Sequence, residues 1–179
     1  MAKQLSLFDD RKPAVEHGGT LSCGKRKGPR PFIRAKPLHL VLRSSHAKGT
    51  QSLHLHREFI LQHLTALTRK WGITVYQFSN NSNHLHLLIR ARDRGGFQNF
   101  LRAFSGTIAM RVTGSGKTRK LKTRFWDQLA YTRIVMWGRH FRTAFKYVVQ
   151  NILETNGVIP YKPRTKSRSN LTSRPPPPI

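Results

Sequence analysis

Two histidines separated by one leucine are the residues of this chain best suited to binding a metal ion. The segment NHLHLLI, from Asn83 to Ile89, alternates polar and apolar residues as a strand does. Because successive strand residues point to opposite faces, His84 and His86 share a face and could bind one divalent cation through their imidazoles. The same alternation is also typical of an ordinary half-buried strand, so the pair alone does not decide between the two interpretations.

A tyrosine and an asparagine near the end of the chain could complete such a site. Tyr147 and Asn151 are four residues apart in a segment with helical spacing, so they share one helix face. If that helix packs beside the histidine strand, Asn151 can supply an oxygen ligand and Tyr147 can act as a nucleophile. Two imidazoles and an amide oxygen suit Mg²⁺ or Mn²⁺. Taken singly, Tyr147 is equally well a surface tyrosine and Asn151 a residue near the helix end.

Hydrophobic periodicity predicts the elements that position these residues. Apolar alternation predicts strands over 38–44, 73–79, 84–91 and 129–135. Apolar residues at helical spacing predict helices from Ser52 to Gly72, from about 94 to Gly114, and from about Gly138 to Thr155. For the last helix, the expected core-facing stripe is Phe141, Phe145, Val148 and Ile152. The order predicts an α+β fold, a ferredoxin-like split β-α-β antiparallel sheet with an additional C-terminal helix that carries the tyrosine.

Three motifs together resemble one known family. NHLHLLI, then RFW, then YVVQN are similar in order and approximate spacing to the single-tyrosine HUH transposases, specifically the REP-associated tyrosine transposase group of the IS200-like superfamily. The resemblance covers about residues 37–157 and implies Tyr147 as catalytic residue, with His84, His86 and Asn151 as metal ligands. Family members commonly have Asn-Pro after the tyrosine, whereas Ile152 follows Asn151 here. A second His-Leu-His, at 54–56, falls at the start of a predicted helix, where residues two positions apart diverge, and is not interpreted as a metal site.

The resemblance also implies a reaction and a substrate. The metal would polarise a phosphate of single-stranded DNA, and Tyr147 would attack it to give a covalent 5′-phosphotyrosine and a free 3′-hydroxyl. Hairpin or palindromic DNA is the expected substrate, and the protein would act as a monomer or a homodimer. Glu154, one turn beyond Asn151, is the main rival as ligand or base. Tyr131 and Tyr161 are the other candidate nucleophiles.

The charge of the chain independently favours nucleic acid as a partner. Lys and Arg number 33 against 7 Asp and Glu, a formal net charge of +26. A basic loop within 113–124 lacks the glycine that a nucleotide-binding phosphate loop needs, because Arg111 stands at that position, and is interpreted as a DNA-contacting loop. The expected DNA-binding residues are Lys117, Arg119, Lys120, Lys122, Arg124 and Arg133. With no membrane span, no signal sequence and one cysteine, the expected location is cytoplasmic and nucleoid-associated.

The two ends of the chain are predicted to be tails. Residues 1–36 are interpreted as a flexible basic tail and 158–179 as a basic, proline-rich one, on either side of a catalytic domain at 37–157. The pentapeptide at 4–8 resembles those that dock into the bacterial DNA polymerase sliding clamp, with Gln4, Leu5, Leu7 and Phe8 as the anchors. Packing of this segment on its own domain is the alternative.

Two other classes of protein remain open from sequence. The same element order serves non-catalytic RNA- or single-strand-binding domains, which stack bases on central-strand aromatics such as Tyr76 and Phe78. A replication initiator or conjugative relaxase would use similar nucleophile chemistry. Relaxases usually carry a third histidine in the metal motif, which is not found here.

Overall fold

The computed structural model describes residues 15–24, 28–116, 118–119 and 123–161. Some predicted contact residues therefore lie outside the described ranges. These are the four anchors of the N-terminal pentapeptide, Gln4, Leu5, Leu7 and Phe8, and three lysines of the basic loop, Lys117, Lys120 and Lys122.

One five-stranded antiparallel sheet forms the centre of the molecule, in the order β1-β5-β2-β4-β3. Its four main strands keep the split β-α-β order, so the predicted ferredoxin-like plan is confirmed. The fourth predicted strand is shorter than expected, and β1 was not predicted. The strands are β1 (Glu16–His17), β2 (Leu38–Arg43), β3 (Ile73–Asn80), β4 (His84–Ala91) and β5 (Tyr131–Ile134).

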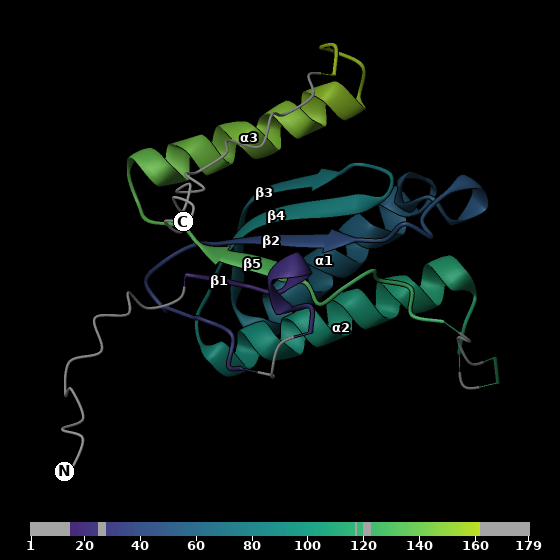
Figure 1. Cartoon of the computed structure of the whole chain (residues 1–179), viewed down its shortest axis with the longest axis horizontal. Helices are drawn as coiled ribbons and strands as arrows, with labels where there is room; N and C mark the ends of the chain where they lie inside the picture. Colours follow the sequence, from purple (N-terminus) through teal and green to yellow (C-terminus); the bar gives the residue numbers. More distant parts are fainter. Residues whose placement is uncertain (1–14, 25–27, 117, 120–122, 162–179) are drawn as a thin grey trace, which may run out of the picture.

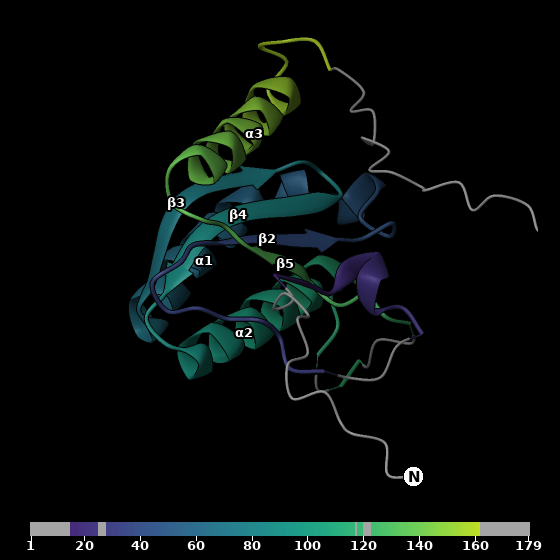
Figure 2. The same cartoon turned by 60° about the vertical axis from the view of Figure 1, so that its left-hand side comes forward.

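Three α-helices cover the sheet unequally. Helices α1 (Arg57–Trp71) and α2 (Arg94–Thr113) lie on one face, and α3 (Arg139–Thr155) crosses the other (Figures 1 and 2). Asp93 caps α2 by accepting from the backbone N–H of Gly96 at 2.7 Å. Short 3₁₀ turns are η1 (Gly19–Ser22), η2 (Gly49–Gln51) and η3 (Leu53–His56). The second His-Leu-His therefore lies in a 3₁₀ turn before α1.

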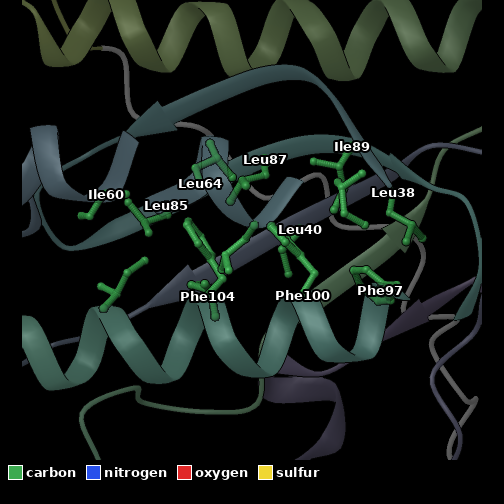
Figure 3. Close-up of a cluster of buried hydrophobic side chains, with 14 of the residues drawn as sticks. Leu38, Leu40, Ile60, Leu64, Leu85, Leu87, Ile89, Phe97, Phe100 and Phe104 are labelled. Carbon is green, nitrogen blue, oxygen red and sulfur yellow. The ribbon is translucent and has the colours of Figure 1, made fainter. Parts of the chain in front are cut away.

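The hydrophobic core fills the space between the sheet and the two helices on its first face. Alternate residues of β2 and β4 meet phenylalanines of α2 there, and all are fully buried (Figure 3). Because strand residues alternate, the remaining residues of β2 and β4 must point to the opposite face, where α3 lies. The histidines of the HLH motif belong to this second set. The residues of these two strands and of α2 that Figure 3 labels are Leu38, Leu40, Leu85, Leu87, Ile89, Phe97, Phe100 and Phe104.

Helix α3 presents a different stripe to the sheet from the predicted one. Val148 and Asn151 are its buried residues, whereas Phe145 is 36% exposed. The predicted stripe of four apolar residues is therefore wrong at Phe145. The reason is that α3 packs on a sheet face that carries histidines, so that a polar residue, Asn151, takes one of the sheet-facing positions.

The segment before β2 also departs from the prediction of an irregular linker up to residue 36. Glu16 and His17 pair with β5 as an edge strand. Arg30 donates from Nη1 to the carbonyl oxygen of Ala130 at 2.8 Å and to Thr132 Oγ1 at 2.5 Å. Burial lowers the pKa of Arg30 to about 10. This segment is ordered despite its linker-like composition because the half-buried guanidinium of Arg30 and a short edge pairing with β5 fix it.

Candidate active site

The turn between β3 and β4 fixes the orientation of His84. Asn83 Oδ1 lies 2.6 Å from His84 Nδ1, and Asn81 Nδ2 lies 3.1 Å from His84 Nε2. An amide oxygen only accepts, so Nδ1 carries the ring proton and Nε2 is the basic nitrogen. Ser79 Oγ donates to Asn81 Oδ1, which orients that amide in turn. The asparagine-rich turn thus holds His84 in the tautomer that a metal ligand through Nε2 requires.

His86 is held by a third histidine that the sequence analysis did not identify. His39 of β2 places Nε2 at 3.2 Å from His86 Nδ1, and the two rings stack with centroids 5.4 Å apart. His86 is only 4% exposed. Burial, reinforced by the charge of Arg133, lowers the pKa of His39 to about 4. His39 alternates with the core leucines of LHLVL, which places it on the sheet face opposite the core. This position in the strand is the sequence signal by which His39 could have been found.

Tyr147 completes the cluster from α3. Its ring meets His86 edge-on at 5.5 Å between centroids and His39 at 5.8 Å, while His84 lies 4.8 Å from His86. The structure therefore brings together His84, His86 and Tyr147, as the sequence analysis predicted.

Asn151 and Glu154 occupy the next turn of α3. Asn151 is 1% exposed, and its Nδ2 donates to the backbone carbonyl of Tyr147 at 2.9 Å, which leaves Oδ1 as its acceptor. Glu154 accepts from Gln150 Nε2 at 2.8 Å. No group of three or more His, Cys, Asp or Glu side chains arranged for a metal occurs among the described residues. Within that part of the chain, a third ligand beside His84 and His86 would therefore have to be of another type, such as an amide.

Two open hollows meet at Tyr147, and both are also lined by His39 and Tyr131. The first, here called the Arg139 hollow, has a volume of about 510 Å³ and also includes Arg133 and His140. The second, called the Arg43 hollow, has a volume of about 540 Å³ and also includes His86, Arg43 and Asp127. Tyr147 therefore lies between arginines of the two hollows, Arg133 and Arg139 in the first and Arg43 in the second.

The surroundings of Tyr131 disfavour its use as a nucleophile. Burial, followed by the negative charge of Glu16, raises the pKa of Tyr131 to about 12. The phenolate of Tyr131 is therefore harder to form, although its ring lines the same hollows. Tyr161, the other candidate, is 68% exposed beyond the end of α3.

The predicted DNA-binding residues are divided between different places. Arg133 lines the Arg139 hollow and lies 3.4 Å from Glu16. Arg124 instead lines a separate hollow beside α2, together with Trp126 and Ser105. Arg119 lies exposed in the loop after α2. Among the described members of the predicted set, only Arg133 adjoins Tyr147.

Helix α3 packs over part of the sheet face on which a base-stacking RNA- or single-strand-binding domain would bind. Tyr76 packs edge-on against Phe141 of α3 at 5.2 Å and against Trp137 at 5.7 Å. Phe78 pairs with Leu87 and packs against the core on the first face. Neither aromatic lies open on the sheet, which disfavours base recognition of the kind used by RNA-recognition domains.

A comparison with protein families decides which family the chain belongs to. The profile of the family described as "Transposase IS200 like" matches residues 35–156, a range that contains the histidine strand and the tyrosine helix. The chain belongs to the IS200-like transposase family. The matched range starts just before β2 and ends just after α3, so the family domain coincides with the main sheet and its three helices.

The fold of this chain is also found in a solved structure. A REP-associated tyrosine transposase bound to a REP hairpin is 12% identical, with a TM-score of 0.59, and the match covers 75% of this chain and 76% of that chain. A candidate transposase from Deinococcus radiodurans R1 is 18% identical, with a TM-score of 0.43, over 70% of this chain and 97% of that one. No curated protein matches. Among the described residues of this IS200-like transposase, no helix is long and apolar enough to cross a membrane.

Proposed function

We propose that this chain is a metal-dependent endonuclease and strand transferase that cuts single-stranded DNA through Tyr147. The observation that carries the proposal is the packing of the Tyr147 ring against His86, with His84 beside it, where two cation-bearing hollows meet. Membership of a transposase family supplies the DNA-processing context.

The proposed reaction is a transesterification. Tyr147 Oη bonds to the phosphorus, the bond from phosphorus to the 3′ oxygen breaks, and the phenolic proton is balanced by the proton gained by the leaving 3′-hydroxyl. The product is a 5′-phosphotyrosine. Because one phosphodiester replaces another, the DNA can be rejoined by the reverse attack of a 3′-hydroxyl without an external energy source.

The residues present fit a divalent cation such as Mg²⁺ or Mn²⁺. His84 Nε2 is the basic nitrogen of its ring and accepts from Asn81 Nδ2, a hydrogen bond that a metal ion would replace, and Asn151 keeps an oxygen as acceptor. His84, His86 and Asn151 would hold the ion. Arg133 and Arg139 in the Arg139 hollow would bind DNA phosphates on one side of Tyr147, and Arg43 in the Arg43 hollow would bind them on the other. When bound, the cation supplies Lewis-acid stabilisation of charge on the attacked phosphate.

His39 is assigned the role of a positioning residue for His86. The contact between His39 Nε2 and His86 Nδ1 requires one proton between the two nitrogens. If His86 Nδ1 donates the proton, His86 Nε2 keeps a lone pair that can bind a metal ion. If His39 Nε2 donates instead, the proton of neutral His86 is on its Nε2, and this nitrogen cannot bind a metal ion. Metal binding by His86 therefore requires His39 to act as the acceptor.

Replacing His39 should weaken metal binding before any chemistry takes place. His39→Ala is expected to lower the affinity for Mn²⁺ by about 10- to 100-fold, the usual cost of removing a hydrogen-bond partner of a ligand. His39→Gln keeps an acceptor oxygen and should restore most of the affinity. His46→Ala, which removes an exposed histidine that lines neither hollow, is the matched control. Calorimetric titration measures all four proteins, and unchanged affinity in His39→Ala would remove this role.

The substrate proposal follows the structural neighbour, which is bound to a REP hairpin. We expect this chain to cut single strands beside a hairpin or palindrome. Incubating the protein with labelled oligonucleotides, with and without Mg²⁺ or Mn²⁺, and running denaturing gels tests the proposal. A covalent protein–DNA band that needs the metal is expected with the hairpin, and equal cutting of a scrambled unstructured strand would remove the hairpin preference.

The N-terminal pentapeptide is proposed to bind a sliding clamp independently of the active site. A peptide of residues 2–10 should bind purified bacterial clamp with a dissociation constant on the order of micromolar, since a short flexible peptide loses entropy on ordering. Replacing Leu7 and Phe8 together by alanine should abolish that binding and leave DNA cleavage by the full chain unchanged. Absence of a saturable signal with the wild-type peptide would rule out this partner.

A further inference from the structure

A third hollow lies toward the opposite end of β4 from His84 and is lined by arginines. It has a volume of about 500 Å³, and three exposed guanidinium groups surround it. Gly72, which ends α1 with a positive φ of 59°, adds no side chain to it. This Arg90 hollow is lined by Arg34, Ala35, Gly72, Thr74, Arg90, Ala91 and Arg92.

No carboxylate neutralises these guanidinium groups in the described part of the chain. The ion pairs found there involve Arg43 and Arg133 only. Asp93, the acidic residue adjacent to the hollow in sequence, accepts from the N–H of Gly96 as the cap of α2. Three arginines gathered without a counter-charge form an attractive site for the phosphates of a polyanion.

An exposed tryptophan connects this hollow with the candidate active site. Trp137 donates from Nε1 to the carbonyl oxygen of Ala35, a lining residue of the Arg90 hollow, at 2.8 Å. The residues two positions before and after it, Val135 and Arg139, line the Arg139 hollow beside Tyr147. Trp137 is 42% exposed and packs against Phe141 at 4.9 Å, so its ring is held in place while part of it remains open to a ligand.

Strand β4 runs past both the histidine site and the Arg90 hollow. His84, His86 and Arg90 share one face of β4 by alternation, and four strand residues from His86 to Arg90 span about 13 Å. At the 3.4 Å rise of a base-stacked strand that span corresponds to about four nucleotides, and a more extended unpaired strand covers it with fewer. A strand whose phosphate lies at Tyr147 therefore reaches the Arg90 hollow after a few nucleotides.

We propose that the Arg90 hollow and Trp137 form a binding site for the unpaired DNA strand that flanks the cut phosphate. This inference rests on the proposed function and names where its substrate continues. Arg34, Arg90 and Arg92 bind phosphates, and a base stacks on the Trp137 ring. A single strand rather than a duplex is assigned because stacking on an aromatic ring needs an unpaired base.

Two pairs of charge-removing substitutions test the arginines. Arg90→Gln with Arg92→Gln is compared with Arg69→Gln and Arg102→Gln, two exposed arginines on the helices of the opposite sheet face. Fluorescence anisotropy measures binding of an oligonucleotide of about 4 nucleotides across the cut site, and of oligonucleotides extended by about 6 unpaired nucleotides on the 5′ or the 3′ side. Replacing Arg90 and Arg92 should weaken binding of one of the extended oligonucleotides by about 10-fold. It should also reduce the slope of log affinity against log salt concentration by about 1.4, while binding of the short oligonucleotide is unchanged.

Trp137→Leu tests the stacked base. This substitution should weaken binding of the extended oligonucleotide by about 5- to 150-fold. Abasic nucleotides in the extension should remove the difference in affinity between the wild type and this variant. Equal losses for the control pair, equal losses for the short strand, or losses confined to a duplex extension would overturn the inference. The proposed function fails separately, because it requires a covalent adduct with the short strand, which this hollow does not touch.

Discussion

Replacing Tyr147 by phenylalanine should abolish formation of the covalent protein–DNA adduct. The substitution removes one hydroxyl oxygen and no charge, so DNA binding should stay within about 2-fold while cleavage falls by on the order of 10³-fold or more, as expected when a nucleophile is lost. Single-turnover cleavage of a labelled hairpin oligonucleotide, with anisotropy for binding, measures the two quantities separately.

Two other tyrosines serve as controls for this substitution. Tyr131→Phe keeps a ring in both hollows and removes a hydroxyl whose pKa is raised to about 12. Tyr161→Phe changes an exposed residue beyond α3. Both variants should still form the adduct. Adduct formation that survives in Tyr147→Phe and is lost in Tyr131→Phe would move the nucleophile to β5.

Replacing either histidine of β4 should produce the second large effect. His84→Ala and His86→Ala should each lower metal-dependent cleavage by at least about 100-fold, because each removes one of two imidazole ligands. Asn151→Ala should be milder, since water can replace one neutral oxygen ligand. Cleavage rates over a series of Mn²⁺ concentrations separate weaker metal binding from slower chemistry.

The chain contains its own control for these histidines. His54 and His56 form a second His-Leu-His in a 3₁₀ turn before α1, outside the lining of the two hollows that meet at Tyr147. Alanine at both positions should leave metal-dependent cleavage unchanged. Full cleavage activity of His84→Ala and His86→Ala in the presence of a chelator would contradict the metal assignment. Circular dichroism shows whether each variant is folded.

The histidine pair and the tyrosine helix could be predicted because local periodicity defines them. Alternation along β4 places His84 and His86 on one face whatever the tertiary structure, and helical spacing places Tyr147 one turn before Asn151. The order of the strands then follows from few possible connections, which is why the split β-α-β sheet was predicted correctly.

The remaining parts of the site depend on pairing between distant strands. His39 reaches His86 only because Val41 of β2 is paired with His86 and the next strand positions follow in register. A local pattern does not contain that register. The stripe of α3 was mispredicted at Phe145 for a similar reason, since the helix packs on a polar sheet face rather than on the core.

The most direct test of the central proposal is to identify the residue that carries the DNA. The protein is incubated with a cleavable hairpin oligonucleotide and Mn²⁺, digested with nuclease and protease, and analysed by tandem mass spectrometry. The nucleotide phosphate is expected on Tyr147, in a 5′ linkage and only when metal is present. A phosphate on Tyr131, Tyr161 or a serine, or cleaved DNA with no nucleotide on the protein, would contradict the account.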